Sequence, residues 1–171
     1  MTHLPEGVKE LPVPRSIQPV AWLLGKWRCE KAYGSYPTIQ DFTYGEEIAF
    51  WNVGQPMLNY NSFSWHTEKF TPMHQEFGFL RLKPESQDVS LLVTHNFGLT
   101  TVEEGQIGDI ALKFESRNIG RMSFAKDPNV LKLVREFSLE GEKLKQVIFM
   151  ATTNTPLTKH LEAVYEKKTN Q

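Results

Sequence analysis

Cysteine is nearly absent from this chain, because Cys29 is the only one among 171 residues. A single thiol excludes an internal disulfide bond and any zinc site built from pairs of cysteines. It agrees with a reducing compartment, so we expect a cytoplasmic protein. No disulfide framework therefore organises the fold.

The chain also lacks an excess of charge of either sign, since 19 lysines and arginines are balanced by 20 aspartates and glutamates. Such a balance provides no positive field for the phosphates of nucleic acids. No stretch approaches the roughly 20 apolar residues of a membrane helix. Motifs for a serine nucleophile, a phosphate-binding loop or a dinucleotide site are missing as well. We therefore expect neither nucleic acid nor a membrane as a partner.

Helical periodicity is confined to one short segment. Residues 19–24 begin with proline and are followed by Gly25, which predicts a single helical turn that could plug one end of a barrel. Residues 1–17 combine prolines and charges without a period and are predicted to form a loosely ordered arm. Residues 18–171 are then predicted to form one domain, which is long enough for a single core.

Alternating apolar and polar residues fill most of the remaining chain, as is typical of β-strands. The predicted strands are 26–33, 42–51, 57–65, 74–83, 88–95, 98–104, 107–116, 118–125, 131–139, 144–152 and 160–167. Their short connections, such as the glycine turn at 140–143, favour antiparallel neighbours. The sequence therefore predicts an all-β fold, an up-and-down antiparallel β-barrel of about ten strands with a short N-terminal helical turn. A closed barrel of this size can hold one ligand.

His160 stands where the last predicted strand begins. Strict alternation puts it on the face of Glu162 and Val164, whereas Leu161 and Ala163 belong to the more apolar face. We therefore predict that His160 lies in the turn just before the strand or at a β-bulge, either of which would direct its side chain toward a pocket. The spacing of the histidines alone does not distinguish a metal ligand from a hydrogen-bonded histidine.

Two other sets of polar residues were considered as sites. Glu46 and Glu47 are adjacent, so they point to opposite faces of a strand and cannot act as a paired acid and base. Arg81, Arg121 and Arg135 lie in predicted strands and could meet inside the barrel to bind a fatty-acid carboxylate. Outward-facing, salt-bridged arginines are the other interpretation. A carrier of a fatty acid or another apolar ligand therefore remains an alternative function.

Several blocks of the sequence resemble the nitrobindin family, in collinear order from about residue 24 to residue 167. The blocks are LGKW at 24–27, YPTI at 36–39, FTYGEEI at 42–48, NY at 59–60, MHQEFGFLR at 73–81 and TPLTKHLEA at 155–163. The resemblance implies a ten-stranded antiparallel barrel that holds one haem b per chain at its mouth.

The resemblance also assigns residues to the haem site. His160 matches the proximal ligand of the haem iron, which makes it the predicted metal ligand. Thr38 matches a position in contact with haem, and Met150 matches a residue in the wall of the pocket. Met73 and His74 match the opposite side of the pocket. Because they are adjacent, they should face apart in a regular strand, so one of them should contribute less.

The activity implied by the resemblance is the isomerisation of peroxynitrite to nitrate on ferric haem, together with the binding of nitric oxide. An iron held by one histidine keeps its other face open for such small nitrogen oxides. The family also allows a homodimer. A haem-based nitric-oxide sensor, with the arm as a contact for a partner, is a further alternative.

The chain departs from the family pattern after Trp27, where Cys29 and Lys31 occupy positions of family glycines. Glycine in a strand allows a ligand to approach closely. The two side chains therefore either crowd the pocket or alter the rim of the barrel. Cys29 itself could be a small buried filler or a thiolate ligand.

Overall fold

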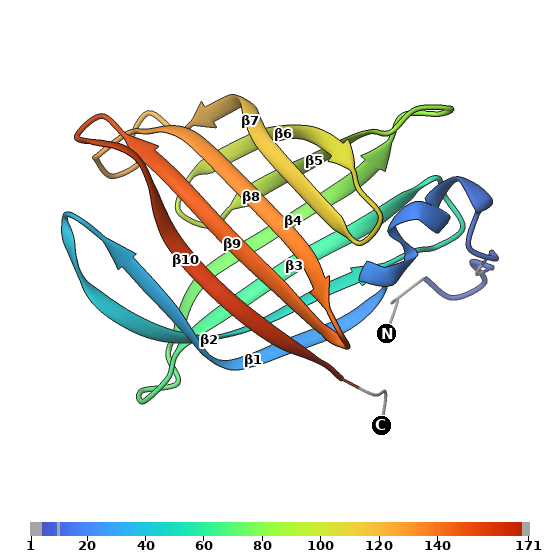
Figure 1. Cartoon of the computed structure of the whole chain (residues 1–171), viewed down its shortest axis with the longest axis horizontal. Coiled ribbons are helices and arrows are strands. Elements are labelled where there is room, and N and C mark those ends of the chain that lie inside the picture. Colours follow the sequence, from blue (N-terminus) through green and yellow to red (C-terminus); the bar gives the residue numbers. More distant parts are fainter. Residues whose placement is uncertain (1–4, 10, 169–171) are drawn as a thin grey trace.

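The computed structural model describes residues 5–9 and 11–168, which form a closed antiparallel barrel of ten strands (Figure 1). Neighbours in the barrel are neighbours in sequence, and β1 pairs with β10 to close it. The predicted fold class is thus confirmed. The elements are η1 (Arg15–Leu23), β1 (Gly25–Tyr36), β2 (Ile39–Trp51), β3 (Met57–His66), β4 (Pro72–Leu82), β5 (Asp88–His95), β6 (Leu99–Ile107), β7 (Ala111–Arg121), β8 (Val130–Glu140), β9 (Lys143–Thr152) and β10 (Thr155–Lys168).

The predicted helical turn is a 3-10 helix that begins four residues earlier than expected, at Arg15, and includes Pro19. A 3-10 helix has three residues per turn, so every third side chain lies on the same face. Ile17, Val20 and Leu23 follow this spacing and are fully buried. Residues 1–4 and 10 of the predicted arm and 169–171 of the predicted domain lie outside the described residues.

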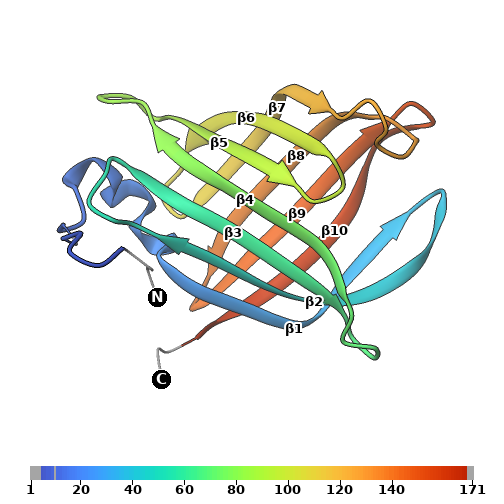
Figure 2. The same cartoon turned by 180° about the vertical axis from the view of Figure 1, so that it is seen from behind.

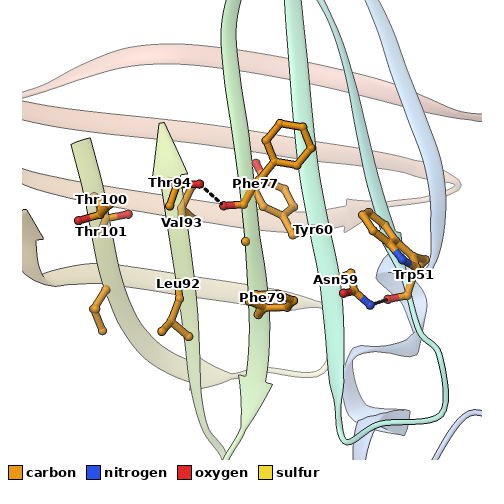
Figure 3. A pocket seen from close by; sticks show the side chains of 12 residues that line it. Trp51, Asn59, Tyr60, Phe77, Phe79, Leu92, Val93, Thr94, Thr100 and Thr101 are labelled. Atoms are coloured by element: carbon orange, nitrogen blue, oxygen red, sulfur yellow. Dashed lines mark hydrogen bonds between the residues drawn. The ribbon is translucent and has the colours of Figure 1, made fainter. Parts of the chain in front are cut away.

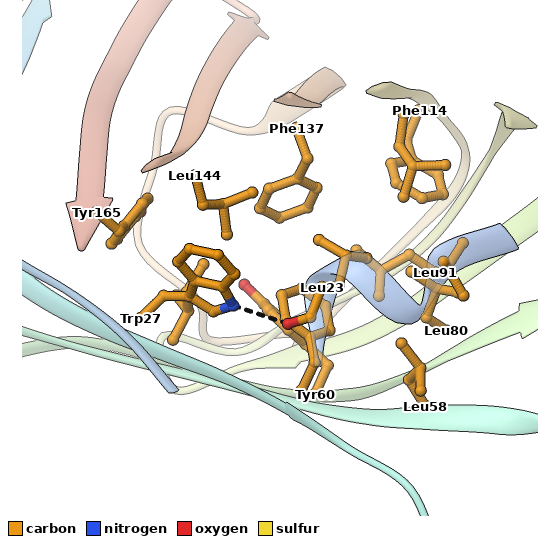
Figure 4. Packing of buried hydrophobic residues seen from close by; sticks show 14 of the residues in the cluster. Leu23, Trp27, Leu58, Tyr60, Leu80, Leu91, Phe114, Phe137, Leu144 and Tyr165 are labelled. Atoms are coloured by element: carbon orange, nitrogen blue, oxygen red, sulfur yellow. Dashed lines mark hydrogen bonds between the residues drawn. The ribbon is translucent and has the colours of Figure 1, made fainter. Parts of the chain in front are cut away.

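The helix η1 lies at one end of the barrel, opposite the turns that join β1 to β2 and β9 to β10 (Figures 1 and 2). Its buried face packs into the apolar core, beside Trp27, Tyr60 and Phe137 (Figure 4). The indole nitrogen of Trp27 donates a hydrogen bond to the carbonyl of Leu23 at 2.7 Å. Side chains therefore fill this end of the barrel, and space for a ligand is left only toward the other end.

Most predicted strands are confirmed, including the hairpin of β8 and β9, whose turn uses Gly141 at a φ of 63°. The separate strand predicted at 118–125 is wrong. Strand β7 runs through this region to Arg121, and residues 122–129 form an irregular connection. Alternation continues in the sequence beyond Arg121, but pairing does not, because the chain turns where the amide of Ala125 donates to the carbonyl of Met122.

The main-chain pairing between β7 and β8 does not extend over the full length of the two strands. Strand β7 pairs with β8 only from Ala111 to Glu115, opposite Ser138 to Val134. Its remaining residues pair with β6 alone, as far as Arg121 opposite Leu99. Strands β7 and β8 therefore separate near the end of the barrel opposite η1, where residues 122–129 form part of the rim.

Candidate functional site

A cavity of about 510 Å³ opens at the end of the barrel opposite η1. It is bounded by the turn between β1 and β2, the turn between β5 and β6, the segment 122–129, and strands β9 and β10. The lining residues are Tyr36, Thr38, Ile39, Asn96, Phe97, Leu99, Arg121, Met122, Phe124, Ala125, Lys126, Asp127, Pro128, Val130, Met150, Thr152 and His160. Most of this surface is apolar, so the cavity suits a large flat ligand with few polar groups.

His160 reaches the cavity from an irregularity in β10. Lys159 pairs with Phe149 and Leu161 pairs with Ile148, the next residue along β9, so His160 is an extra residue without a partner in that ladder. This is the predicted β-bulge, which turns the side chain away from the direction that strict alternation would give it. The bulge places the imidazole in the cavity wall.

The imidazole of His160 is held in one tautomer. Its Nδ1 lies 3.1 Å from the carbonyl oxygen of Ser35, which can only accept, so Nδ1 carries the proton. Nε2 keeps its lone pair and has no hydrogen-bond partner among the described residues. Burial lowers the pKa of His160, although the Ser35 carbonyl partly opposes that effect. Tyr36 and Phe42 pack edge-on against the ring, at centroid distances of 5.1 and 6.3 Å.

The structure brings together three of the five predicted cofactor-binding residues. Thr38, in the turn between β1 and β2, and Met150, on β9, line the same cavity as His160. Met73 and His74 are not among the residues that line this cavity. The Nε2 atom of His74 lies 3.1 Å from Nδ1 of His95 on β5, and burial lowers the pKa of His74 to about 4.

Neither replacement of a family glycine crowds the cavity. Cys29 is part of the buried apolar core, and burial raises the pKa of its thiol. Lys31 is exposed. The structure therefore agrees with Cys29 as a buried filler and leaves the cavity free of both side chains.

A buried charged network crosses the barrel and was not predicted from the sequence. The guanidinium of Arg135 donates to Glu76 at 2.9 and 3.1 Å and to Glu103 at 3.0 and 3.3 Å. Burial alone would raise the pKa of Glu76, but Arg135 and His95 hold it well below its usual value. Tyr60 donates to Glu76 as well, at 2.6 Å.

The network had a signal in the sequence. Its members lie on the inward-facing positions of their strands, in phase with buried residues such as Leu91 and Val93 for His95, and Phe137 for Arg135. Alternation could therefore have placed these charged residues inside. It could not have paired them, because Arg135 is 59 residues away from Glu76 in sequence.

The three strand arginines do not meet inside the barrel. Arg81 is exposed, and Arg121 lies at the rim of the cavity, where it donates to Asp127 at 3.1 Å. Arg135 is buried, but two carboxylates already occupy its guanidinium. The possible cluster for a fatty-acid carboxylate is therefore not formed, and Arg121 fits the other interpretation, a salt-bridged arginine outside the core.

A second hollow of about 410 Å³ lies on the outer face of β3 to β6 (Figure 3). Phe77, Phe79 and Leu92 line it and are between 38% and 56% exposed, so they point away from the interior. Its exposed polar groups are the amide of Asn59 and the hydroxyls of Thr94 and Thr100. This surface is apolar and offers no acid, base or metal ligand comparable to His160.

Within the described part of the chain, no helix has the length and apolar character needed to cross a bilayer.

Fold and site together define a class, a closed antiparallel barrel that presents a neutral histidine nitrogen to an open, mostly apolar cavity, as expected of a cofactor-binding barrel. Residues 16–167 match the family described as the THAP4-like, haem-binding β-barrel domain. The chain belongs to this family, which confirms the resemblance found in the sequence.

Relatives cover the chain almost completely. Human "Peroxynitrite isomerase THAP4" is 44% identical over 155 residues, which are 90% of this chain and 27% of that protein. The chain thus spans about a quarter of the length of the vertebrate relatives. A "Peroxynitrite isomerase" of Nocardia farcinica is 36% identical, with 98% of this chain and 99% of that protein covered. The crystal structure of Rv2717c from M. tuberculosis superposes with a TM-score of 0.83 at 30% identity, covering 92% of this chain and all of the other.

Proposed function

We propose that this protein binds one haem b in the cavity, with His160 as the proximal ligand, and isomerises peroxynitrite to nitrate. The observation that supports this most directly is the fixed tautomer of His160, whose free Nε2 belongs to a residue of the cavity wall. The family is haem-binding, and relatives that align with nearly the whole chain carry the name peroxynitrite isomerase.

The residues of the cavity fit haem. Phe97, Leu99 and Met150 offer apolar surface for the faces of the macrocycle, and the imidazole offers a neutral nitrogen for its iron. Arg121 and Lys126 lie at the rim, where cationic groups would pair with the propionates. The pocket has the size of other sites for single large ligands.

The residues of the chain would contribute by binding, orienting and excluding water. Bound ferric haem would supply an iron with an open coordination position for a small nitrogen oxide. The Ser35 carbonyl and the rings of Tyr36 and Phe42 fix the plane of His160. Arg121 and Lys126 attract an anion to the mouth. Peroxynitrite and nitrate have the same atoms and charge, so no side chain has to transfer a proton.

Several finer features belong to the same proposal. Thr38 and Met150 would contact the haem from the cavity wall, and Met73 and His74 remain predicted contacts. Nitric oxide would bind at the same open position. We further propose that the functional domain is the barrel together with η1, so that the boundary predicted between residues 17 and 18 moves to before Arg15. We also propose that the protein works in the cytoplasm and that two copies can form a homodimer.

The alternative function as a fatty-acid carrier has lost its proposed anchor, because Arg135 is paired with Glu76 and Glu103. The alternative as a haem-based sensor uses the same cavity and the same histidine, so it depends on the same first experiment.

That experiment is an absorption titration of the haem-free protein with ferric haem. The unmodified protein should bind one equivalent with the spectrum of a histidine-ligated haem. His160→Ala should lose this spectrum and weaken binding by at least about tenfold, because His160 is the histidine that, among the described residues, lines the cavity with a free imidazole nitrogen. The haem-loaded protein should then accelerate the conversion of peroxynitrite to nitrate in stopped-flow measurements.

His66→Ala is a matched control, because His66 lies at the end of β3 and is absent from the cavity lining. It should bind haem as the unmodified protein does. An unchanged spectrum and affinity in His160→Ala would contradict the proposed site.

A further inference from the structure

A second group of potential metal ligands lies outside the cavity lining. His74 and Glu76 are two residues apart on β4 and face the same side, and Glu76 pairs across the ladder with His95 on β5. Phe97, which does line the cavity, packs against both histidine rings at centroid distances of 4.8 and 5.3 Å. None of the three residues lines the cavity of His160, and Phe97 connects the two sites.

Three potential donor atoms converge in this group. His74 Nε2 lies 3.1 Å from His95 Nδ1, His95 Nδ1 lies 3.3 Å from Glu76 Oε1, and His74 Nε2 lies 3.7 Å from Glu76 Oε1. Ligands about 2.1 Å from a zinc ion, arranged tetrahedrally, are about 3.4 Å from one another. The three observed distances lie on either side of this value, so an ion could enter with little movement of the strands.

The hydrogen bonds of His95 leave the correct nitrogen free for a metal. Thr101 donates its hydroxyl proton to Glu103 at 2.8 Å, so its oxygen accepts from His95 Nε2 at 3.3 Å. His95 therefore keeps a proton on Nε2, and any proton that Nδ1 shares with Glu76 would be released when the metal binds, which leaves Nδ1 with a lone pair for the ion. A ligating histidine usually donates its other N–H to an outer partner in this way.

The charges of the network favour a cation at this place. Arg135 is the one guanidinium between the two carboxylates of Glu76 and Glu103, and all three side chains are at most 4% exposed. With both carboxylates ionised, one negative charge is left in a site from which water is largely excluded, and either a proton on His95 or a bound cation would compensate it. A bound cation would supply the missing positive charge.

We propose that His74 Nε2, His95 Nδ1 and Glu76 Oε1 bind a divalent first-row transition-metal ion, such as Zn²⁺, at a non-haem site. Two imidazoles and one carboxylate are a ligand set that suits such ions. The side chain of His74 is 32% exposed, which leaves room for water to complete the coordination. The ion would join β4 to β5 and fix the two rings on which Phe97 packs. The inference does not require haem, but it gives His74, a predicted haem contact, a second role as a metal ligand.

Titration of the full-length, haem-free and chelator-treated protein with Co²⁺ and Zn²⁺ tests this proposal. Absorption in the visible range should show one equivalent of Co²⁺ in a low-symmetry nitrogen and oxygen site, and Zn²⁺ should displace it. His74→Ala should weaken binding by at least about tenfold. Its side chain is partly exposed, so the variant should fold, which circular dichroism would verify.

His160→Ala and His66→Ala are the matched controls and should bind the ion as the unmodified protein does. Three results would overturn the proposal: no saturable binding of one ion by the unmodified protein, equal binding by His74→Ala, or loss of binding in His160→Ala. The last result would place the ion in the cavity instead. Each of the three results would mean that His74, His95 and Glu76 are joined by shared protons and not by a metal ion.

Discussion

The phenol of Tyr165 lies 2.6 Å from two oxygens, Glu46 Oε2 and Gln146 Oε1, but it has only one proton to donate. The phenol can therefore donate to only one of these two oxygens at a time. Burial raises the pKa of Glu46, and the hydrogen bonds from Ser62 and Tyr165 oppose this only partly. The inner residue of the adjacent pair Glu46 and Glu47 is thus held in a buried hydrogen-bond network, where burial favours its protonated form.

Replacement of Glu46 by glutamine should change how stability depends on pH. A carboxyl whose pKa is raised in the folded state stabilises that state fully below its unfolded value, 4.5, and this contribution is lost as the pH rises through the folded pKa. Glu46→Gln does not titrate. Urea unfolding should therefore show the variant gaining stability relative to the unmodified protein as the pH rises above about 4.5.

Glu47→Gln is the control for this experiment, because Glu47 lies on the opposite face near Lys26 and Arg28. It should not reproduce the gain. A difference between Glu46→Gln and the unmodified protein that stays constant with pH would show that Glu46 is ionised in the folded protein.

Among the elements, η1 is the one that covers an end of the barrel, and it does so with three buried side chains. Leu23→Ala should lower the free energy of unfolding by about 2–5 kcal/mol, because it leaves a cavity where the helix meets the core. Leu131→Ala, at a position 61% exposed on β8, should change it by less than about 0.5 kcal/mol. Equal midpoints for the two variants in chemical denaturation would mean that η1 contributes little to the core.

The accuracy of the sequence-based prediction varied between elements for physical reasons. Strands with one face inside produce a period of two, which is why nearly all of them were found. The start of η1 was missed because its buried residues, Ile17, Val20 and Leu23, repeat every three residues and Pro19 looked like a beginning. The end of β7 was missed because alternation at 118–125 reports which face is apolar, not whether a neighbouring strand is present.

At the scale of the whole molecule, the network around Arg135 ties together four strands, because Tyr60, Glu76, Glu103 and Arg135 lie on β3, β4, β6 and β8. Arg135→Ala would leave two buried carboxylates without their partner. We expect a loss of about 3–5 kcal/mol in the free energy of unfolding, measured by guanidinium denaturation.

The matched comparison is Lys113→Ala, which removes the partner of Glu136 in an ion pair of 2.9 Å on the surface. Its cost should stay below about 1 kcal/mol, because solvent screens exposed pairs. If the two variants lost the same free energy of unfolding, burial would not make the ion pairs of Arg135 more important for stability than a surface pair.

Whole-molecule features differed in how far the sequence revealed them. The barrel followed from strand count and short turns, and His160 followed from the family resemblance together with its conflict with strict alternation. The group of His74, Glu76 and His95 could not be predicted, because the sequence does not show which inward-facing residues of different strands come together. Thr38 and Met150 reach the cavity of His160 from two other parts of the chain, which only the folded barrel brings together.

The early end of the ladder between β7 and β8 has a consequence for how a rigid, bulky group can enter a closed barrel. A continuous wall would have to break main-chain hydrogen bonds to widen, each of which stabilises the fold by about 1 kcal/mol. Here the wall already has a seam beyond Glu115 and Val134, flanked by the irregular segment 122–129. Opening the rim along this seam would break the hydrogen bond from the Leu133 amide to Ser116 Oγ but no main-chain pair between the two strands, so a bulky ligand could enter the cavity without unfolding of the barrel.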